Sequence, residues 1–393
     1  MTNSGPFSPV HIGPITLKNR IVKAATFEGV MPKGAVSDEL VSFHRKVAAG
    51  GAAMTTVAYC SVSESGRVHR NTMVMKPEIT ADLQRVTDAV HAEGALACAQ
   101  IGHAGPVANQ MSNGTRSLAP SARFSAPAMG RVRAIDEADM DEIVGQFESA
   151  TRVAIDAGFD AVEVHLGHNY LLSSFLSPNL NHRSDRFGGS IENRLRFPRR
   201  VLEAVRTTAG DRVAVTAKLN MADGVEGGLW LDESIPMAEV IAADGVLDAI
   251  QLSGGSSLLN SMYLFRGEVP MAEMAATQSK LVGFGMKHFA KGLFPEYPFE
   301  EAFFLPYARQ FRAAVDIPLI LLGGINRLDT IETALEEGFE AVAMARALLR
   351  EPDLPNRFRD ASRTEGLCVH CNKCMPTIYR GTHCVLVPPE QRW

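Results

Sequence analysis

The sequence has no apolar run long enough to cross a bilayer, and its first residues, Met1 to Pro6, are polar where a secretion signal would be apolar. An excess of one charge is also missing. Over 393 residues the formal net charge is −5 and the pI is near 6.1, so nothing indicates binding to nucleic acid or to an anionic membrane. Internal repeats and low-complexity tracts are absent. These absences predict a cytoplasmic protein without nucleic-acid or membrane partners.

Cysteine is scarce, with six residues, and it is unevenly placed. Cys60 and Cys98 stand alone among small apolar residues, which predicts buried thiols that contribute to packing. The other four crowd the C-terminal end of the chain. In a chain without a secretion signal, such crowding favours a metal site over disulfides. These four are Cys368, Cys371, Cys374 and Cys384.

Hydrophobic residues make up 46% of the chain, enough for a large core, and they form eight short runs without polar alternation. Such runs are typical of strands covered on both faces. Segments with helical periodicity lie between them. The pattern predicts an α/β fold, a (β/α)8 barrel; a doubly wound sheet is the alternative, but no Gly-x-Gly-x-x-Gly turn follows the first run. The predicted strands are 20–25, 52–59, 95–101, 159–165, 212–219, 246–252, 317–322 and 339–345, and the predicted helices are 39–49, 80–93, 140–157, 191–208, 234–243, 300–315 and 328–338.

Two long segments interrupt this alternation, 112–133 after the third predicted strand and 258–297 after the sixth. Loops after barrel strands shape the active site, so either segment is a candidate for the wall of a substrate pocket. Ordinary surface loops are the alternative.

Chemically useful residues stand where most of the predicted strands end. A barrel brings these ends to one face, where such enzymes keep their chemistry. The pair Gly323-Gly324 and the pair Ala345-Arg346 follow strands seven and eight, whose loops commonly bind a phosphate. Lys218 is a charged residue in an apolar strand, so its ammonium group needs a compensating negative charge. That charge could come from a ligand, or Lys218 could belong to a structural ion pair.

His165 and His168 lie three residues apart at the end of the fourth predicted strand, followed by Tyr170. The two imidazoles could be metal ligands, satisfied core histidines, or groups that polarise one substrate oxygen. No third ligand stands nearby in the sequence, which argues against a metal. In a role on a substrate, the phenol could supply a proton.

The run His165-Leu-Gly-His168-Asn-Tyr170 continues through Phe175-Leu-Ser-Pro178 and Arg186-Phe-Gly-Gly-Ser-Ile-Glu-Asn-Arg194. It resembles the signature of the Old Yellow Enzyme family of flavin oxidoreductases, and the resemblance extends from about Pro6 to Pro352. It implies a barrel that binds FMN, takes hydride from NAD(P)H and passes it to an activated C=C bond of an α,β-unsaturated carbonyl or nitro compound.

The resemblance also implies roles for single residues. His165 and His168 would hold the substrate oxygen, Tyr170 would donate the proton, and Phe27 would face the substrate. Cofactor-binding positions would be Ala25, Thr26, Tyr59, Gln100, Lys218, Gly323, Gly324, Ala345 and Arg346, with Cys60 also matching a position beside the ring.

Three positions depart from the family pattern. Phe27 stands where relatives often place a threonine or cysteine that tunes the flavin potential, Lys218 where many carry arginine, and Asn169 where glycine is commoner. Phenylalanine cannot form the hydrogen bond to the flavin, whereas lysine keeps the positive charge.

The C-terminal cysteines have the spacing C-x2-C-x2-C-x9-C. They resemble the iron–sulfur segment of the 2,4-dienoyl-CoA reductase branch, whose third interval is one residue longer. Thiolates so spaced suit a [4Fe–4S] cluster or tetrahedral zinc, and a remnant without metal is the alternative. We expect residues 1–352 to form the FMN-binding barrel and residues 353–393 a cysteine-containing extension packed on it.

The sequence therefore predicts an FMN-dependent ene-reductase that acts on a small molecule, in a homo-oligomer. The alternatives are an FMN-dependent amine or ether dehydrogenase or demethylase, and an electron-transfer component that uses a cysteine-bound cluster.

Overall fold

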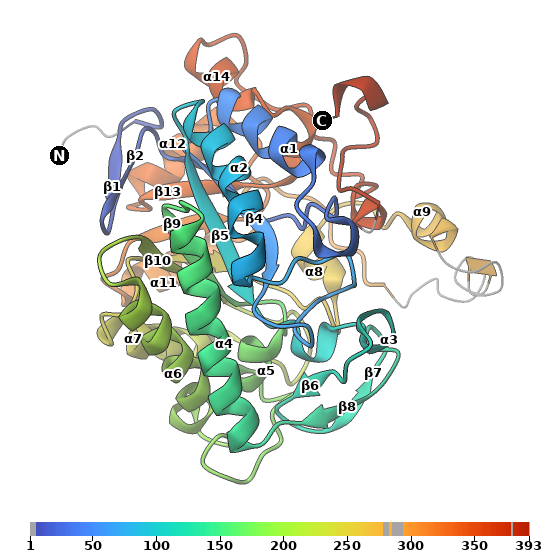
Figure 1. The fold of residues 1–393 in the computed structure, drawn as a ribbon. Coiled ribbons are helices and arrows are strands. Elements are labelled where there is room, and N and C mark those ends of the chain that lie inside the picture. Colours follow the sequence, from blue (N-terminus) through green and yellow to red (C-terminus); the bar gives the residue numbers. More distant parts are fainter. Residues whose placement is uncertain (1–4, 278–282, 285–293, 379, 393) are drawn as a thin grey trace.

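Eight parallel strands close into a barrel in the computed structural model, which describes residues 5–277, 283–284, 294–378 and 380–392. Helices surround this barrel, so the predicted (β/α)8 fold is confirmed (Figure 1). The strands are β3 (Ile21–Lys23), β4 (Met54–Ser61), β5 (Leu96–Gly102), β9 (Ala161–Leu166), β10 (Ala214–Asn220), β11 (Ala249–Ser253), β12 (Leu319–Leu322) and β13 (Ala341–Met344). The main helices are α1 (Asp38–Ala49), α2 (Thr80–His91), α4 (Glu137–Asp156), α6 (Ile191–Ala209), α7 (Leu231–Ala243), α11 (Leu305–Ala314), α12 (Leu328–Glu336) and α13 (Arg346–Arg350).

Three helices begin three or more residues away from the sequence prediction, and one of them is α7, which begins at Leu231 rather than residue 234. Helix α4 begins at Glu137 rather than residue 140, because Asp136 and Asp139 form a capping box that satisfies the first amide groups. Helix α11 begins at Leu305 rather than residue 300, with a proline in its first turn.

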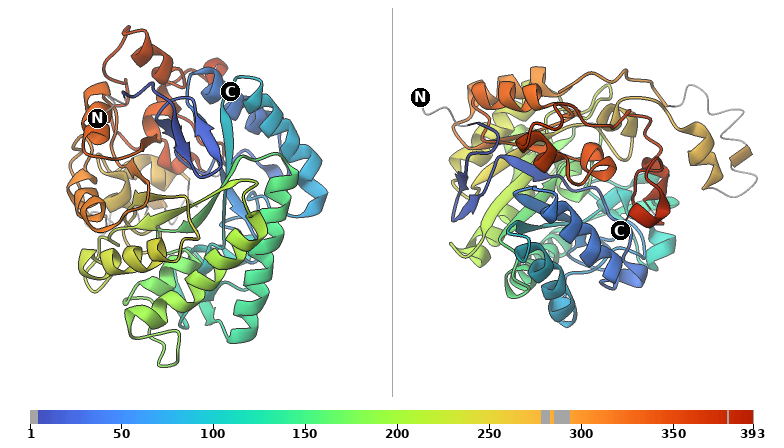
Figure 2. Two further views of the ribbon diagram at one scale, coloured as in Figure 1. Left: turned by 90° about the vertical axis from the view of Figure 1, so that its left-hand side faces the viewer. Right: turned by 90° about the horizontal axis from the view of Figure 1, so that it is seen from above.

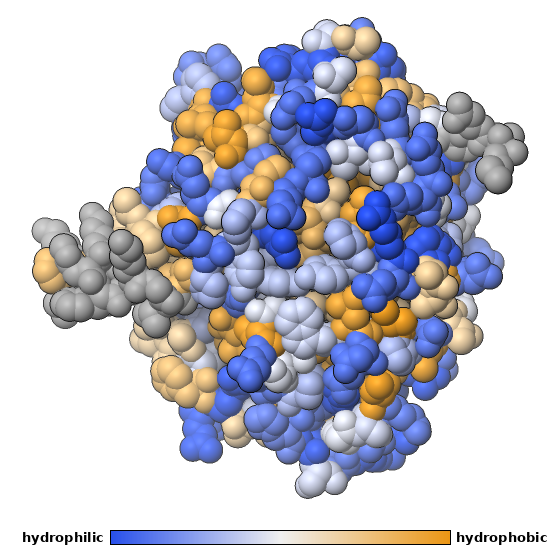
Figure 3. All heavy atoms as spheres, turned by 180° about the vertical axis from the view of Figure 1, so that it is seen from behind, coloured by the Kyte–Doolittle hydropathy of each residue, from blue (hydrophilic) through white to orange (hydrophobic). Residues whose placement is uncertain are grey.

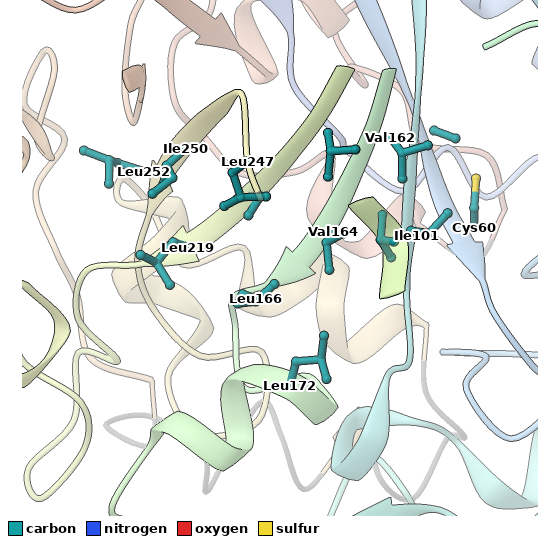
Figure 4. Packing of buried hydrophobic residues seen from close by; sticks show 14 of the residues in the cluster. Cys60, Ile101, Val162, Val164, Leu166, Leu172, Leu219, Leu247, Ile250 and Leu252 are labelled. Carbon is teal, nitrogen blue, oxygen red and sulfur yellow. The ribbon is translucent and has the colours of Figure 1, made fainter. Parts of the chain in front are cut away.

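Each barrel strand sends alternate side chains to two different environments. On β9, Val162, Val164 and Leu166 point outward into the layer between strands and helices, which Figure 4 shows together with side chains of β5, β10 and β11. Ala161, Glu163 and His165 occupy the alternate positions and therefore face the inside of the barrel. A charged residue and a histidine thus stand within a fully buried strand.

Small residues fill the amino-terminal end of the barrel interior. Alanines that begin β9, β10, β11 and β13 are buried in one cluster with Val10, Ile12 and Leu17 of a hairpin, β1 (Val10–Ile12) and β2 (Ile15–Leu17). The hairpin closes this end, because its apolar side chains fit against the short alanine side chains. Access to the interior is left to the opposite end, where the strands terminate.

The predicted long segment 112–133 carries structure of its own. Strands β6 (Leu118–Ala119), β7 (Arg123–Ser125) and β8 (Gly130–Ala134) form a small sheet beside the barrel, visible at the lower right of Figure 1. The segment 258–297 contains α8 (Ser261–Phe265) and α9 (Met271–Ala276). Its residues 278–282 and 285–293 lie outside the described part of the chain.

After α14 (Leu354–Arg359) the chain continues as an irregular tail that lies beside α1 in Figure 1 and in both views of Figure 2. The Thr382 amide donates to the backbone oxygen of Glu28 at 2.7 Å, and the Thr382 hydroxyl donates to that of Phe27. Cys374 and Cys384 pack against a cluster that includes Phe43 of α1. These contacts support the division that we propose, a barrel of residues 1–352 and a docked extension of residues 353–393.

None of the described helices combines the length and apolar character needed to cross a membrane. On the face seen in Figure 3, apolar side chains form small patches separated by polar ones. Single apolar residues on a surface are common in proteins and need no partner.

Gly29 tests the docking of the tail on the barrel. Its φ is +66°, and a Cβ atom there would lie 1.9 Å from the Ile378 backbone oxygen, whereas Gly94, with φ +67°, has open space around it. Gly94→Ala should therefore cost about 1–2 kcal/mol for the left-handed backbone alone. Gly29→Ala should lower the melting temperature clearly further, because the tail must also move. Equal melting temperatures of the two variants in a thermal scan would contradict this docking.

Candidate functional site

A cavity of about 400 Å³ opens at the carboxyl ends of the barrel strands, a size typical of small-molecule sites. Every residue that the sequence predicted for cofactor, substrate or catalysis lines it, except Cys60, whose buried side chain packs in the layer between the strands and the helices. Residues of both long segments, such as Pro127 and Leu264, form part of its wall. The predicted residues that meet there are Ala25, Thr26, Phe27, Tyr59, Gln100, His165, His168, Tyr170, Lys218, Gly323, Gly324, Ala345 and Arg346.

His165, His168 and Tyr170 form a compact aromatic group on one side of the cavity. The His165 and Tyr170 rings are stacked with centroids 4.3 Å apart, and the His165 and His168 rings meet edge to face at 5.1 Å. The Gly167 amide donates to His165 Nδ1 at 3.2 Å, so the ring proton of a neutral His165 is on Nε2. His168 Nε2 lies 2.8 Å from the Ser253 hydroxyl. Both rings are held by bonds to the protein in fixed orientations.

The turn that carries these side chains is built from two left-handed residues, since φ is +58° at both His168 and Asn169. Asparagine tolerates this conformation better than most residues, which explains how it can replace the commoner glycine. Its side-chain amide donates to Asp223 Oδ1 at 3.1 Å, and the His168 amide donates to Asn220 Oδ1 at 3.1 Å. Asn220 also donates to Asp223 Oδ1, at 3.0 Å, so one buried network fixes the turn.

Both histidines are neutral near pH 7. Burial lowers the pKa of His168 to about 3, and the positive charge of Lys218 adds to this. Burial also lowers the pKa of His165 well below its usual range, with further contributions from His168 and Lys218. Neutral imidazoles polarise an acceptor by donating a hydrogen bond and do not titrate in the physiological range.

Gln100 on β5 and Lys218 on β10 flank β9, the strand of His165, and share a partner that the sequence prediction missed. Gln100 Nε2 donates to Glu163 Oε1 at 2.6 Å, and Lys218 Nζ lies 3.2 Å from the same oxygen. Glu163 could have been found from its spacing, because it stands two residues before His165 on a strand with a period of two. Lys218 therefore both lines the cavity and forms the buried ion pair considered as the alternative.

Gly323, Gly324 and Arg346 lie at the end of the cavity formed by β12 and β13. The glycines have φ of +123° and +74°, and a Cβ atom on either would come within 2.5 Å of a phenylalanine ring, from Phe304 or Phe303. Only glycine therefore fits this turn, which leaves its backbone without side chains at the edge of the cavity. Arg346 donates to the Arg266 backbone oxygen at 3.0 Å and to Asn372 Oδ1.

This set of groups fits FMN. A buried amide and a buried ammonium suit the hydrogen-bonding edge of a flavin ring, and a glycine turn with an arginine suits a phosphate. Phe27, with φ +53°, carries a phenyl ring, which has no nitrogen or oxygen atom that could form a hydrogen bond to a flavin. The Thr26 hydroxyl accepts from Lys23 Nζ at 2.7 Å and donates to Glu28 Oε1 at 3.2 Å, so it belongs to a buried ion pair behind the cavity.

The four C-terminal cysteines line one small cavity, and Cys374 also lines the larger one beside His370. Burial raises the pKa of Cys368, and raises that of Cys374 to about 12. Arg346 lies between the two cavities and opposes these shifts with its charge. Among the described residues, no three histidine, cysteine or acidic side chains stand in the arrangement of a metal-ligand set.

Comparison with known proteins identifies relatives that span most of this chain. Residues 6–255 match the protein family described as the NADH:flavin oxidoreductase / NADH oxidase family. A protein of Rhodococcus erythropolis named 4,4'-dithiodibutanoate disulfide reductase is 68% identical over 380 residues, which cover 97% of this chain and 94% of the relative.

Solved structures share the fold. A 2-naphthoyl-CoA reductase in complex with 2-naphthoyl-CoA aligns with a TM-score of 0.83 at 23% identity, over 98% of this chain and 57% of the longer protein. An Old Yellow Enzyme homologue from Zymomonas mobilis aligns with a TM-score of 0.72 at 23% identity, over 93% of this chain and 96% of that one.

The lowered pKa of His168 predicts how stability depends on pH. Between its ordinary pKa of 6.5 and its folded value of about 3, the unfolded chain binds a proton that the folded chain does not. Stability should therefore fall as pH drops below 6.5, by up to about 1.4 kcal/mol per pH unit for this one group. His168→Gln should lose less melting temperature than the wild type between pH 7.5 and pH 5. A larger loss in the variant would mean that His168 is charged when folded.

Proposed function

This chain belongs to the NADH:flavin oxidoreductase / NADH oxidase family, and from that premise we propose that it reduces the disulfide bond of a small organic disulfide. It is an FMN-dependent NAD(P)H oxidoreductase, and the proposal concerns the acceptor. One observation carries it: the 68% identity to the 4,4'-dithiodibutanoate disulfide reductase extends over nearly the whole of both chains.

The residues of the cavity suit this chemistry. When bound, FMN takes two electrons from NAD(P)H and supplies them to the acceptor. Cleavage of one S–S bond by two electrons leaves two sulfur anions, which two protons convert to thiols. His165, with its proton on Nε2, can donate to a developing thiolate, and Tyr170, stacked on it, can supply a proton. The lowered pKa values of both histidines keep the rings neutral near pH 7, and a neutral imidazole still donates a hydrogen bond through its one N–H group.

Reduction of an activated C=C bond is the second candidate, favoured by the His165, His168 and Tyr170 group. Two fixed imidazoles beside a phenol can hold one carbonyl or nitro oxygen, stabilise the enolate that forms, and return a proton to carbon. The same side chains serve both acceptors, because each reaction places negative charge next to them.

An anaerobic stopped-flow experiment separates the two acceptors. The enzyme-bound flavin is reduced with NADH or NADPH and then mixed with 4,4'-dithiodibutanoate or with 2-cyclohexenone, and its reoxidation is followed by absorbance. We expect the disulfide to reoxidise the flavin much faster than the enone. Faster reoxidation by the enone would replace the first proposal with the second, and none with either acceptor would contradict both.

His165→Ala should lower the rate of reoxidation about 10²- to 10³-fold, the loss typical of removing one donor to a developing anion. The rate of flavin reduction by NAD(P)H and the flavin content of this variant are measured alongside. His11→Ala, in the hairpin at the closed end of the barrel, is the matched control and should leave the rate unchanged. An unaltered rate in His165→Ala would remove this residue from the proposed site.

We further propose that the tail cysteines hold a metal centre, a [4Fe–4S] cluster or zinc. The support is that all four line one cavity next to the buried cation of Arg346, which favours thiolates. The thiols would have to turn toward this cavity to bind. Anaerobically purified protein should contain iron with labile sulfide, or zinc, and Cys371→Ser should lose it while Cys98→Ala, at a buried position in the barrel, keeps it. Protein without either metal would contradict this proposal.

A further inference from the structure

Glu163 is the least expected charged group in the barrel. It belongs to β9, and its side chain points into the barrel on the same strand face as His165, almost completely buried. It does not line the cavity, but both of its hydrogen-bonding neighbours, Gln100 and Lys218, do. Any influence of Glu163 on an occupant of the cavity therefore passes through these two side chains or through its charge.

The ion pair between Lys218 and Glu163 has a high desolvation cost. Lys218 and Glu163 are 2% and 5% exposed in their side chains and lie 3.2 Å apart, so both charges have lost their water. A buried pair of this kind is often no more stabilising than two well-packed apolar residues. Stability alone does not account for the placement of a carboxylate below the floor of the cavity.

Glu163 also determines which way the Gln100 amide faces. An ionised carboxylate only accepts hydrogen bonds, so the Gln100 NH2 group must be the part that points to Glu163. The Gln100 carbonyl oxygen is then directed away from Glu163. Without the carboxylate, either end of the amide could take that position.

We propose that Glu163 is a positioning residue that sets the redox potential of the bound flavin. It holds Lys218 in place, orients the amide of Gln100, and adds a negative charge next to the ammonium group. Reduction of the flavin adds negative charge to its ring, which Lys218 stabilises and the carboxylate of Glu163 opposes. Glu163 thus keeps the flavin a strong reductant. This inference rests on FMN binding but not on which acceptor the enzyme reduces.

The test is the midpoint potential of the enzyme-bound flavin, measured by anaerobic dye-coupled titration. Glu163→Gln should favour reduced over oxidised FMN about tenfold, a shift of about +30 mV for a two-electron couple. Glu163→Asp, which retains the charge, should remain near the wild type. Glu233→Gln removes a carboxylate from Arg194 between α6 and α7, outside the cavity, and should leave the potential unchanged.

A second variant keeps the inference testable if Glu163→Gln does not fold. Lys218→Met should shift the potential in the negative direction, and Glu163→Gln combined with Lys218→Met removes both charges without leaving one unpaired. The double variant should lie between the two single shifts. An unchanged or more negative potential in Glu163→Gln, or in the double variant relative to Lys218→Met, would overturn the role of Glu163.

The potential is measured without any acceptor. If neither the disulfide nor the enone reoxidises the flavin while these shifts appear, the proposed function is wrong and the role of Glu163 stands. If the substrate is reduced but the potential does not change when Glu163 is replaced, the proposed function stands and the role of Glu163 is wrong.

Discussion

A closed barrel of parallel strands imposes one constraint on which everything else in this molecule depends: all eight strands end on the same rim. Residues as distant in sequence as Ala25 and Arg346 therefore line a single cavity. The opposite end is closed by the β1–β2 hairpin, which packs on the alanines that begin several strands. In the described part of the chain, the cavity therefore opens at the carboxyl ends of the strands, and the polar residues named above gather there.

This arrangement places charged side chains in buried positions. Lys218 pairs with Glu163, and Lys23 pairs with Glu28, whose pKa is lowered to about 2 mainly by the charge of Lys23, against the effect of burial. Each pair includes or adjoins a residue that lines the cavity. The charges would be costly as isolated groups. Pairing with Glu163 lets Lys218 present its ammonium group to a ligand, whereas Lys23 lies over Phe43 of α1 and does not line the cavity.

The C-terminal tail also contributes to the wall of the cavity. Thr382 bonds to the backbone of Phe27 and Glu28, and Cys374 lines the same cavity as the histidines. The wall of the cavity is thus shared between the first strand-to-helix loop and the last part of the chain. A change in the tail, such as metal binding, would reach the cavity through backbone contacts rather than across a solvent gap.

The sequence by itself determined the barrel and the residues of its rim, because unbroken apolar runs and helical segments with a period of 3.6 can be recognised from neighbouring residues, and the strand ends follow from them. His165, His168 and Lys218 could be selected in this way. Only the tertiary structure decided that Glu163 pairs with Lys218, that Asn169 sits in a left-handed turn held by Asp223, and that the tail docks on Gly29. These contacts join residues tens to hundreds of positions apart, and their distances are set by packing in three dimensions, which local sequence patterns do not encode.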